Sequence, residues 1–229
     1  MGSDPSLSVT GPIIMPASGG EPQNIVVLVH GYGSNADDLL QLVLSWQTAL
    51  PDTVFVAPNG FEPCPGAPGC YQWWGLKTFT LEEGAAGVRR AASILDAFID
   101  EQLARFDLTE QRLALVGFSQ GTVLALQTAP RRRKPIAGVV GYSGMVADPV
   151  DLTVNLRTRP SVLLVHGDAD RVIPIAAFHK TTKTLAGLGF DLTTHISPGL
   201  GHSIDTVGLA FGKEFLVERQ TAFRTDQRR

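Results

Sequence analysis

One five-residue motif, Gly117-Phe118-Ser119-Gln120-Gly121, constrains the fold more than any other stretch of this chain. The apolar run at 112–116 comes just before it and is typical of a strand that is buried on both faces. The run at 122–127 comes just after it and is typical of a buried helix. The two glycines permit a turn that is too tight for larger residues, so we expect a strand, a sharp turn and a helix.

Such a turn would lift the Ser119 hydroxyl above the sheet. It would also point the backbone N–H of Gln120 and the helix N-terminus at one spot, where an oxyanion could form. The alternative is an ordinary serine in a glycine-flanked turn, because five-residue patterns also occur by chance. The rest of the chain decides between the two interpretations.

Apolar runs elsewhere alternate between strand and helix patterns. The expected strands are 25–30, 53–57, 136–142, 161–166 and 190–196, with a short edge strand near 13–14, and the expected helices are 37–50, 81–105, 176–188 and 204–218. This alternation predicts an α/β fold with a mostly parallel central sheet and helices on both faces. We expect one domain over 1–229, with 1–20 as an extended N-terminal segment and 221–229 as a frayed tail.

Charge and cysteine usage exclude several classes of function. Lys and Arg number 19 against 22 Asp and Glu, a near balance that argues against nucleic acid or an anionic membrane as the main partner. No stretch is long and apolar enough for stable membrane insertion, and the N-terminus lacks a signal-peptide pattern, so we expect a cytoplasmic location. Cys64 and Cys70 are the only cysteines, and we expect them to be free thiols rather than metal ligands.

A reactive serine needs a base, and four histidines follow Ser119 in the chain. His166 precedes Asp168 and Asp170, His179 lies on an expected helix, and His195 lies on an expected strand. His202 lies in a glycine-rich loop after the last strand, at the carboxyl ends of the strands, where open α/β sheets place their ligands. We therefore predict His202 as the base, against the alternative of a loop histidine that caps a helix.

The acid must follow a strand, and this condition leaves four aspartates. Asp148 and Asp151 follow one expected strand, and Asp168 and Asp170 follow the next. Asp168 comes directly at the strand end and could form an Asx-turn. Asp170 comes two residues later and can reach across more easily, so the chemistry favours Asp170 by a small margin.

The chain resembles the phospholipase/carboxylesterase family of α/β-hydrolases, which includes the acyl-protein thioesterases. The segments that carry the resemblance are His30-Gly31-Tyr32-Gly33, Gly117-Phe118-Ser119-Gln120-Gly121, His166-Gly167-Asp168-Ala169-Asp170-Arg171-Val172-Ile173-Pro174 and Gly201-His202-Ser203-Ile204. The resemblance implies the α/β-hydrolase fold, Ser119 as nucleophile, Asp170 as acid and His202 as base. It implies the backbone N–H groups of Tyr32 and Gln120 as the oxyanion hole, and His30 then has a structural role at most.

Three features depart from the family pattern and bear on substrate range. Thr122 follows the motif where another glycine is common, Met145 follows Ser143-Gly144, and Trp73-Trp74 replaces the more usual Trp-Phe or Trp-Tyr. The tryptophans lie in a long segment, 58–80, that has no convincing periodicity, and loops of this length are usually functional. We predict Trp73, Trp74, Leu76 and Met145 as substrate-binding residues. An aromatic cluster that packs the loop down is an equally weighted alternative for the two tryptophans.

The predicted function is that of a carboxylesterase, a serine hydrolase that acts on short to medium acyl esters through an acyl-enzyme. No cofactor and no metal are expected, the partner is a small-molecule carboxylic ester, and a homodimer is left open. An acyl-protein thioesterase or a lysophospholipase would use the same triad. A non-catalytic binding module on the same fold is a remote alternative. It predicts that one of the triad residues is missing from the sequence, and none is missing.

Overall fold

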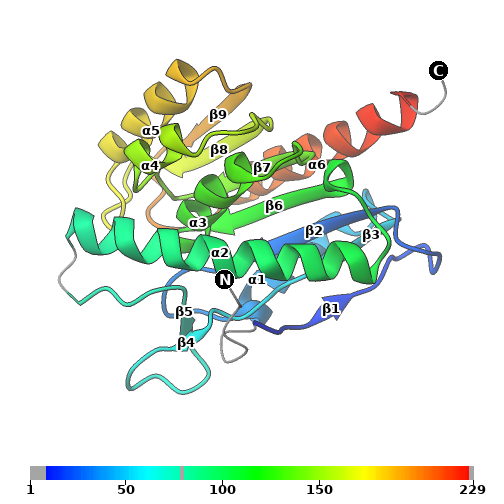
Figure 1. Cartoon of the computed structure of the whole chain (residues 1–229), viewed down its shortest axis with the longest axis horizontal. Helices are drawn as coiled ribbons and strands as arrows, with labels where there is room; N and C mark the ends of the chain where they lie inside the picture. The colour runs from blue at the N-terminus through cyan, green and yellow to red at the C-terminus, as the bar shows by residue number, and fades with distance from the viewer. Residues whose placement is uncertain (1–8, 78–79, 227–229) are drawn as a thin grey trace.

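The computed structural model describes residues 9–77 and 80–226 (Figure 1). Over these residues the main sheet has seven strands in the order β1-β3-β2-β6-β7-β8-β9. Their bounds are β1 Ile13–Ile14, β2 Asn24–Val29, β3 Thr53–Val56, β6 Leu113–Phe118, β7 Gly138–Tyr142, β8 Val162–Gly167 and β9 Leu192–Ser197. Within this seven-stranded sheet only β1 pairs antiparallel, with β3, and this confirms the expected mostly parallel sheet with an edge strand at its start.

Helices cover both faces of this sheet, as Figure 1 shows. Their bounds are α1 Ala36–Trp46, α2 Leu81–Arg105, α3 Gln120–Thr128, α4 Pro149–Val154, α5 Ile175–Gly187 and α6 Thr206–Asp226. Strand side chains alternate between the two faces. Ile25 and Val27 of β2 therefore pack with α2 and α3, whereas Val26 and Leu28 pack with α1 and α6. Because both faces are buried, the strand is apolar at every position after Asn24.

Four elements differ from the sequence-based expectations or go beyond them. Helix α4 is too short to show periodicity; it begins at Pro149, with the Asp148 side chain capping its N-terminus. Strands β4 (Glu62–Pro63) and β5 (Tyr71–Gln72) form a small hairpin inside the segment that shows no periodicity. Helix α6 extends to Asp226, into the stretch for which we expect fraying.

A buried hydrogen bond from Thr53 to Gln220 anchors α6 close to its end. Parts of three expectations lie outside the described residues: 1–8 of the extended N-terminal segment, 78–79 of the 58–80 segment and 227–229 of the tail. Within the described residues, no helix is long and apolar enough to cross a membrane.

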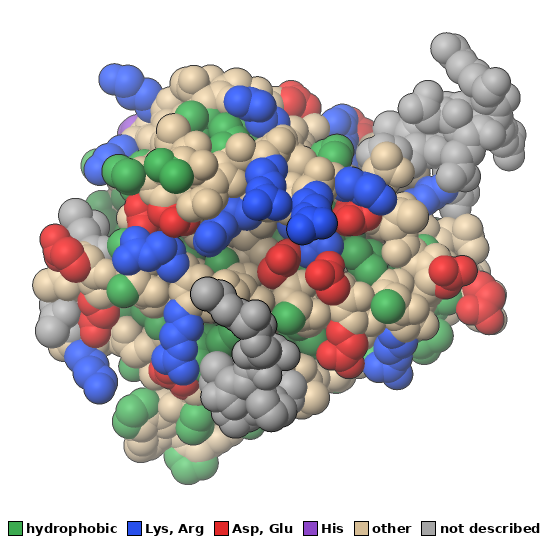
Figure 2. Space-filling model, viewed as in Figure 1, with side chains coloured by type: hydrophobic (Ala, Val, Ile, Leu, Met, Phe, Trp, Pro, Cys, Tyr) green, Lys and Arg blue, Asp and Glu red, His purple; other side chains and the backbone are tan. Residues whose placement is uncertain are grey.

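Ion pairs hold α2 against the elements beside it. Figure 2 shows basic and acidic side chains interspersed over this face of the molecule. Arg132, after the end of α3, is only 6% exposed and pairs with Asp96 and, at 2.6 Å, with Asp100, both on α2. Arg89 of α2 pairs with Asp148 at the start of α4. These ion pairs fix helix α2 over the sheet. Its N-terminal half packs against Trp74, in the segment after β5.

Candidate active site

Ser119 lies between β6 and α3 with φ 54° and ψ −118°, a conformation outside the regions that residues with side chains usually adopt. Close packing maintains this strain. A Cβ atom on Gly121 would lie 1.8 Å from the carbonyl oxygen of Val29, and one on Gly117 would lie 2.5 Å from the backbone nitrogen of Thr122. Both positions therefore require glycine, and the turn holds the Ser119 side chain at the carboxyl end of the sheet.

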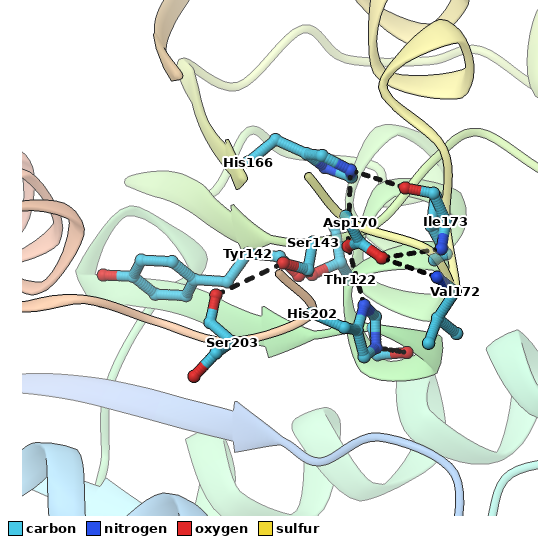
Figure 3. Close-up of polar contacts among 10 residues, drawn as sticks. Thr122, Tyr142, Ser143, His166, Asp170, Val172, Ile173, His202 and Ser203 are labelled. Carbon is cyan, nitrogen blue, oxygen red and sulfur yellow. Dashed lines mark hydrogen bonds and ion pairs between the residues drawn. The ribbon is translucent and has the colours of Figure 1, made fainter. Parts of the chain in front are cut away.

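His202, in the loop after β9, contacts both Asp170 and Ser119, and Figure 3 shows its contact with Asp170. Its Nδ1 lies 2.7 Å from Asp170 Oδ2, and its Nε2 lies 2.9 Å from Ser119 Oγ. An ionised carboxylate only accepts hydrogen bonds, so Nδ1 carries the proton and donates to Asp170. This tautomer leaves Nε2 free to accept the Ser119 hydroxyl, which is the arrangement that proton abstraction requires.

Asp170 has a side chain with no exposed surface. Its other oxygen, Oδ1, accepts from the backbone N–H groups of Val172 at 2.8 Å and Ile173 at 2.9 Å. Burial raises the pKa of this carboxyl, but the hydrogen bonds from His202, Ile173 and Val172 outweigh that effect, and the net pKa lies below the ordinary value. Asp170 is therefore a charged acceptor for the histidine at neutral pH.

His166, at the end of β8, is a contact that sequence reasoning missed. Its Nε2 donates to the carbonyl oxygen of Ile173 at 2.8 Å and lies 3.5 Å from Asp170 Oδ2. Figure 3 shows it on the side of Asp170 opposite His202. The imidazole that reaches Ser119 is that of His202 and not that of His166, but the spacing of four residues between His166 and Asp170 was a signal that the two could be in contact. It fixes the turn whose amides hold the carboxylate.

Asp168 has a different role from Asp170. Its Oδ1 accepts from the backbone N–H of Gly199 at 2.6 Å, and the residue is exposed. It thereby supports the loop that carries His202, without contacting the imidazole in any described hydrogen bond. The structure brings Asp170, and not Asp168, to the histidine.

His30 has the structural role expected for it. Its Nε2 accepts from the Gly60 N–H at 2.8 Å, so its Nδ1 carries the proton and donates to the Gly31 carbonyl oxygen at 2.7 Å. Burial lowers the pKa of His30, and this outweighs the opposing effects of the Gly31 carbonyl and of Asp38. The imidazole is accordingly neutral and joins the loop after β2 to the segment after β3.

The loop that follows His30 lies directly against the serine. A Cβ atom on Gly31 would lie 3.2 Å from Ser119 Cβ, and Tyr32 is the next residue. Gln120 is the first residue of α3, and the first N–H groups of a helix have no partner within it. The backbone amides of Tyr32 and Gln120 thus belong to the two turns that meet at Ser119.

The Gln120 side chain has a function that the sequence analysis missed. Its Oε1 accepts from the Trp73 backbone N–H at 2.9 Å, and its Nε2 donates to the Trp74 carbonyl at 2.9 Å. Trp73 Nε1 also donates to the His30 carbonyl at 2.9 Å. The buried side-chain amide of Gln120 therefore fastens the 58–77 segment next to Ser119.

The four predicted substrate-binding residues divide into two pairs. Trp73 has no exposed surface and Trp74 is 6% exposed, and a Cβ atom on Gly87 of α2 would lie 2.3 Å from Trp74 Cγ. The tryptophans pack the segment onto the core, as the packing alternative expects, and their contact with substrate stays a prediction. Leu76 and Met145 are only partly buried.

Met145 lines an apolar cavity of about 420 Å³. The cavity lies between the N-terminal part of α2, the segment after β7 and α5, and its lining residues are Glu82, Ala85, Met145, Val146, Ala147, Pro149, Ala177, Lys180 and Thr181. The Thr181 hydroxyl accepts from the Val146 N–H at 2.9 Å and so fixes the wall that carries Met145. The cavity thus lies beyond the end of β7. In the sheet, β7 lies between β6, which leads to Ser119, and β8, which leads to Asp170.

A strained serine that is hydrogen-bonded through an imidazole to a buried carboxylate, on a mostly parallel sheet with helices on both faces, defines an α/β-hydrolase. The crystal structure of esterase PE8 superimposes with a TM-score of 0.88 at 38% identity, and the match covers 92% of this chain and 99% of PE8. Arabidopsis thaliana SOBER1, at 20% identity and a TM-score of 0.77 over 86% of this chain and 98% of SOBER1, shares the fold.

Sequence comparison identifies the family. The phospholipase/carboxylesterase family model matches residues 12–219. Esterase YpfH of Escherichia coli is 27% identical over 85% of this chain and 82% of its own length. Acyl-protein thioesterase 1 of Gibberella zeae is 24% identical over 84% of this chain and 88% of its own length. The chain belongs to the phospholipase/carboxylesterase family, and its reaction is the hydrolysis of carboxylic esters.

Proposed function

We propose that Ser119, His202 and Asp170 form the catalytic triad of this carboxylesterase. The observation that carries the proposal is the position of His202, whose two nitrogens lie 2.9 Å from Ser119 Oγ and 2.7 Å from Asp170 Oδ2. His202 Nε2 takes the Ser119 proton as Oγ attacks the ester carbonyl carbon. Asp170 holds the imidazole in the required tautomer and stabilises its positive charge.

The tetrahedral intermediate then collapses to an acyl-enzyme. The C–O bond to the alcohol breaks, and the leaving alkoxide takes the proton from His202. Water enters, loses a proton to the same Nε2, and attacks the acyl carbon. Collapse of the second intermediate releases the acid and returns the proton to Ser119 Oγ, so the cycle balances without a cofactor.

The backbone N–H groups of Tyr32 and Gln120 are the proposed oxyanion hole. Two features support this role: the loop at Gly31 packs against Ser119, and Gln120 opens α3 with an amide that no helical carbonyl can satisfy. The positive end of the helix dipole adds to the stabilisation of the negative oxygen. Donors of this kind contribute roughly 10²- to 10³-fold each in comparable hydrolases.

The proposed substrates are short to medium acyl esters of small alcohols or phenols. The cavity beside Met145, about 420 Å³ with mostly apolar walls, supports binding of the acyl group there. Its volume falls near the lower end of the roughly 300–1,000 Å³ that is usual for ligand pockets. Several relatives are named acyl-protein thioesterase 1, so a thioester of similar acyl length is the alternative substrate.

Active-site labelling tests the nucleophile directly. A fluorophosphonate should modify Ser119 and abolish turnover, with the adduct located by peptide mass spectrometry. Ser203→Ala is the matched control, because Ser203 is an exposed serine beside His202 in sequence and should leave labelling intact. An adduct on any other serine would overturn the assignment.

A substrate panel separates the alternatives. It should contain nitrophenyl esters of increasing acyl length, an S-acylated peptide and a lysophospholipid, all assayed for kcat/KM. The proposal requires the highest value for a short or medium nitrophenyl ester. A higher value for the peptide or the lysophospholipid would assign the chain to the thioesterase or lysophospholipase reaction with the same triad.

A further inference from the structure

The two cysteines lie opposite each other on the β4–β5 hairpin. Strands β4 and β5 pair antiparallel, with Glu62 opposite Gln72 and Pro63 opposite Tyr71. The same register, continued by one residue, places Cys64 opposite Cys70, and the Cys64 N–H donates to the Cys70 carbonyl at 2.9 Å. Both thiols are free in this structure.

Their side chains project from one face of the hairpin. Residues two apart on a strand share a face, so Cys64 lies on the face of Glu62, and Cys70 on that of Gln72. Two contacts agree with this: Gln72 Nε2 donates to Glu62 Oε2 at 3.0 Å, and Cys64 Sγ lies 3.8 Å from Gln72 Oε1. Directly opposed residues on antiparallel strands have Cα atoms about 4.5–5.5 Å apart, within the roughly 4.4–6.8 Å that disulfides span.

The hairpin is hydrogen-bonded to the 31–34 loop, which lies against Ser119 at Gly31. The Tyr71 N–H donates to the Ser34 carbonyl at 2.7 Å, and the Gly33 N–H donates to the Tyr71 carbonyl at 3.0 Å. Gly33 follows Tyr32, the proposed oxyanion donor, and the hairpin leads on to Trp73, which Gln120 holds. Figure 1 shows the hairpin at the lower edge of the molecule, away from α4 and α5.

We propose that Cys64 and Cys70 form an intramolecular disulfide by exchange with a small-molecule disulfide such as oxidised glutathione, and that this bond clamps the hairpin against the 31–34 loop. The Cys70 thiolate attacks one glutathione sulfur, the glutathione S–S bond breaks, and one glutathione leaves. The Cys64 thiolate then attacks the Cys70 sulfur and expels the second glutathione. Two protein thiols are oxidised, one glutathione disulfide is reduced to two thiols, and these take the two protons.

The difference in exposure between the two thiols sets the order of these steps. Cys64 is buried, whereas Cys70 is partly exposed and is the thiol that an external disulfide reaches first. Burial also raises the pKa of Cys64, and this outweighs the opposing effect of the Gly33 backbone N–H. At neutral pH, Cys64 is therefore less often a thiolate than an ordinary cysteine is. Cys70 is therefore the entry point, and Cys64 resolves the mixed disulfide.

Peptide mapping after equilibration in glutathione redox buffers tests the bond. Lys77 is the first Lys or Arg in the sequence, so one tryptic peptide carries both cysteines. In excess glutathione disulfide this peptide should lose two hydrogens and take up no alkylating agent. Cys64→Ser should stop at a mixed disulfide on Cys70. A wild-type peptide that stays fully reduced, or that carries glutathione on both cysteines, would overturn the proposal.

Thermal denaturation and hydrogen exchange test the clamp. Closing a loop of this size should raise the Tm of the wild type by about 5 °C under oxidising conditions. It should also slow hydrogen exchange at the Gly33 and Tyr71 amides. The Tm and the exchange rates of Cys64→Ser and of Cys70→Ser should be the same under oxidising and reducing conditions. An oxidised wild type with the Tm and exchange rates of the reduced form would refute the clamp. Ser119→Ala should form the same disulfide, which separates this inference from the proposed catalysis.

Discussion

Two regions meet at Ser119 and are held in place by different means. We call the first the catalytic edge: the proposed triad of Ser119, Asp170 and His202 at the carboxyl ends of the strands. Backbone ladders between neighbouring strands fix it, and the Ser119 N–H itself donates to the carbonyl at the end of β7. The second is the 58–77 segment, whose hairpin is short. A few backbone bonds tie Tyr71 to the 31–34 loop, and side chains, chiefly the Gln120 amide and the Trp73 ring, hold the part beside Ser119.

This difference separates chemistry from stability. A substitution in the catalytic edge removes a reacting group while the strand ladders remain, so it should lower kcat without unfolding the protein. A substitution that releases the 58–77 segment leaves the triad intact but unpairs buried backbone groups, so it should lower stability first. The following experiments test that division, beginning with the largest expected effect.

Ser119→Ala should lower kcat by about 10⁴-fold or more, because only the oxyanion hole and substrate binding remain. The Tm should change little, since the Ser119 side chain makes one described hydrogen bond, to His202. Esterase kinetics and calorimetry on the same preparation measure both quantities. A large drop in Tm would mean that the catalytic edge is not independent of the fold.

Asp170→Asn should lower kcat by about 10³- to 10⁴-fold, because an amide can stabilise the wrong histidine tautomer. Asp168→Asn is the matched control, since Asp168 supports the His202 loop through Gly199 and does not touch the imidazole. It should cost far less in kcat and lower Tm only slightly, because an Asn oxygen can still accept from Gly199. The reverse ranking of the two variants would assign the acid to Asp168.

The catalytic edge was predictable from sequence because its geometry is encoded locally. The glycines around Ser119 allow a single turn, and the loops after consecutive parallel strands must reach the same edge of the sheet. That logic located Ser119 and His202. It left Asp168 and Asp170 nearly equal, because which carboxylate turns inward depends on the amides of Val172 and Ile173.

The 58–77 segment was not predictable in the same way. Its two strands are short and carry no periodic signal, and its position depends on contacts between residues far apart in the chain. Trp73 and Gln120, for example, are separated by 47 positions. Pocket walls and packed cores contain the same aromatic residue types, so the sequence alone could not decide which role the two tryptophans have.

Gln120→Met should destabilise the protein by roughly 2–4 kcal/mol, because the buried backbone groups of Trp73 and Trp74 lose their partners. The backbone N–H of residue 120 remains, so kcat should fall by less than about tenfold. Gln127→Met, on the same helix and also buried, is the matched control for a polar group lost away from the segment. If Gln120→Met loses kcat at unchanged Tm, its amide acts in catalysis and not in support.

Acid should weaken the two regions in separate pH windows. The folded pKa of His30 is lowered, so the unfolded chain binds the extra proton, and stability falls as the pH drops below the ordinary histidine value of about 6.5. The folded pKa of Asp170 is also lowered, so its contribution is present above about pH 3.9 and is lost as the pH falls further. Tm measured against pH should therefore decline in two stages.

Variants assign each stage of this decline. His30→Gln retains a donor and an acceptor but does not titrate, and it should flatten the decline between about pH 7 and 5. Asp170→Asn should reduce the decline below about pH 4 and leave the upper stage unchanged. If neither variant alters its window, other groups control the acid response.

The smallest expected effect concerns acyl-chain length, and it tests whether the tryptophans or the cavity select the substrate. Met145→Ala enlarges the cavity and should shift the optimum of kcat/KM toward longer acyl chains. The change per methylene should be about fourfold, from roughly 0.8 kcal/mol per buried CH₂ group.

Trp74→Phe leaves that wall intact but reduces packing against α2, so it should lower Tm and keep the wild-type chain-length profile. Val150→Ala, at an exposed position on α4, is the control for both. A shifted profile in Trp74→Phe with an unchanged Met145→Ala profile would return the acyl site to the aromatic segment.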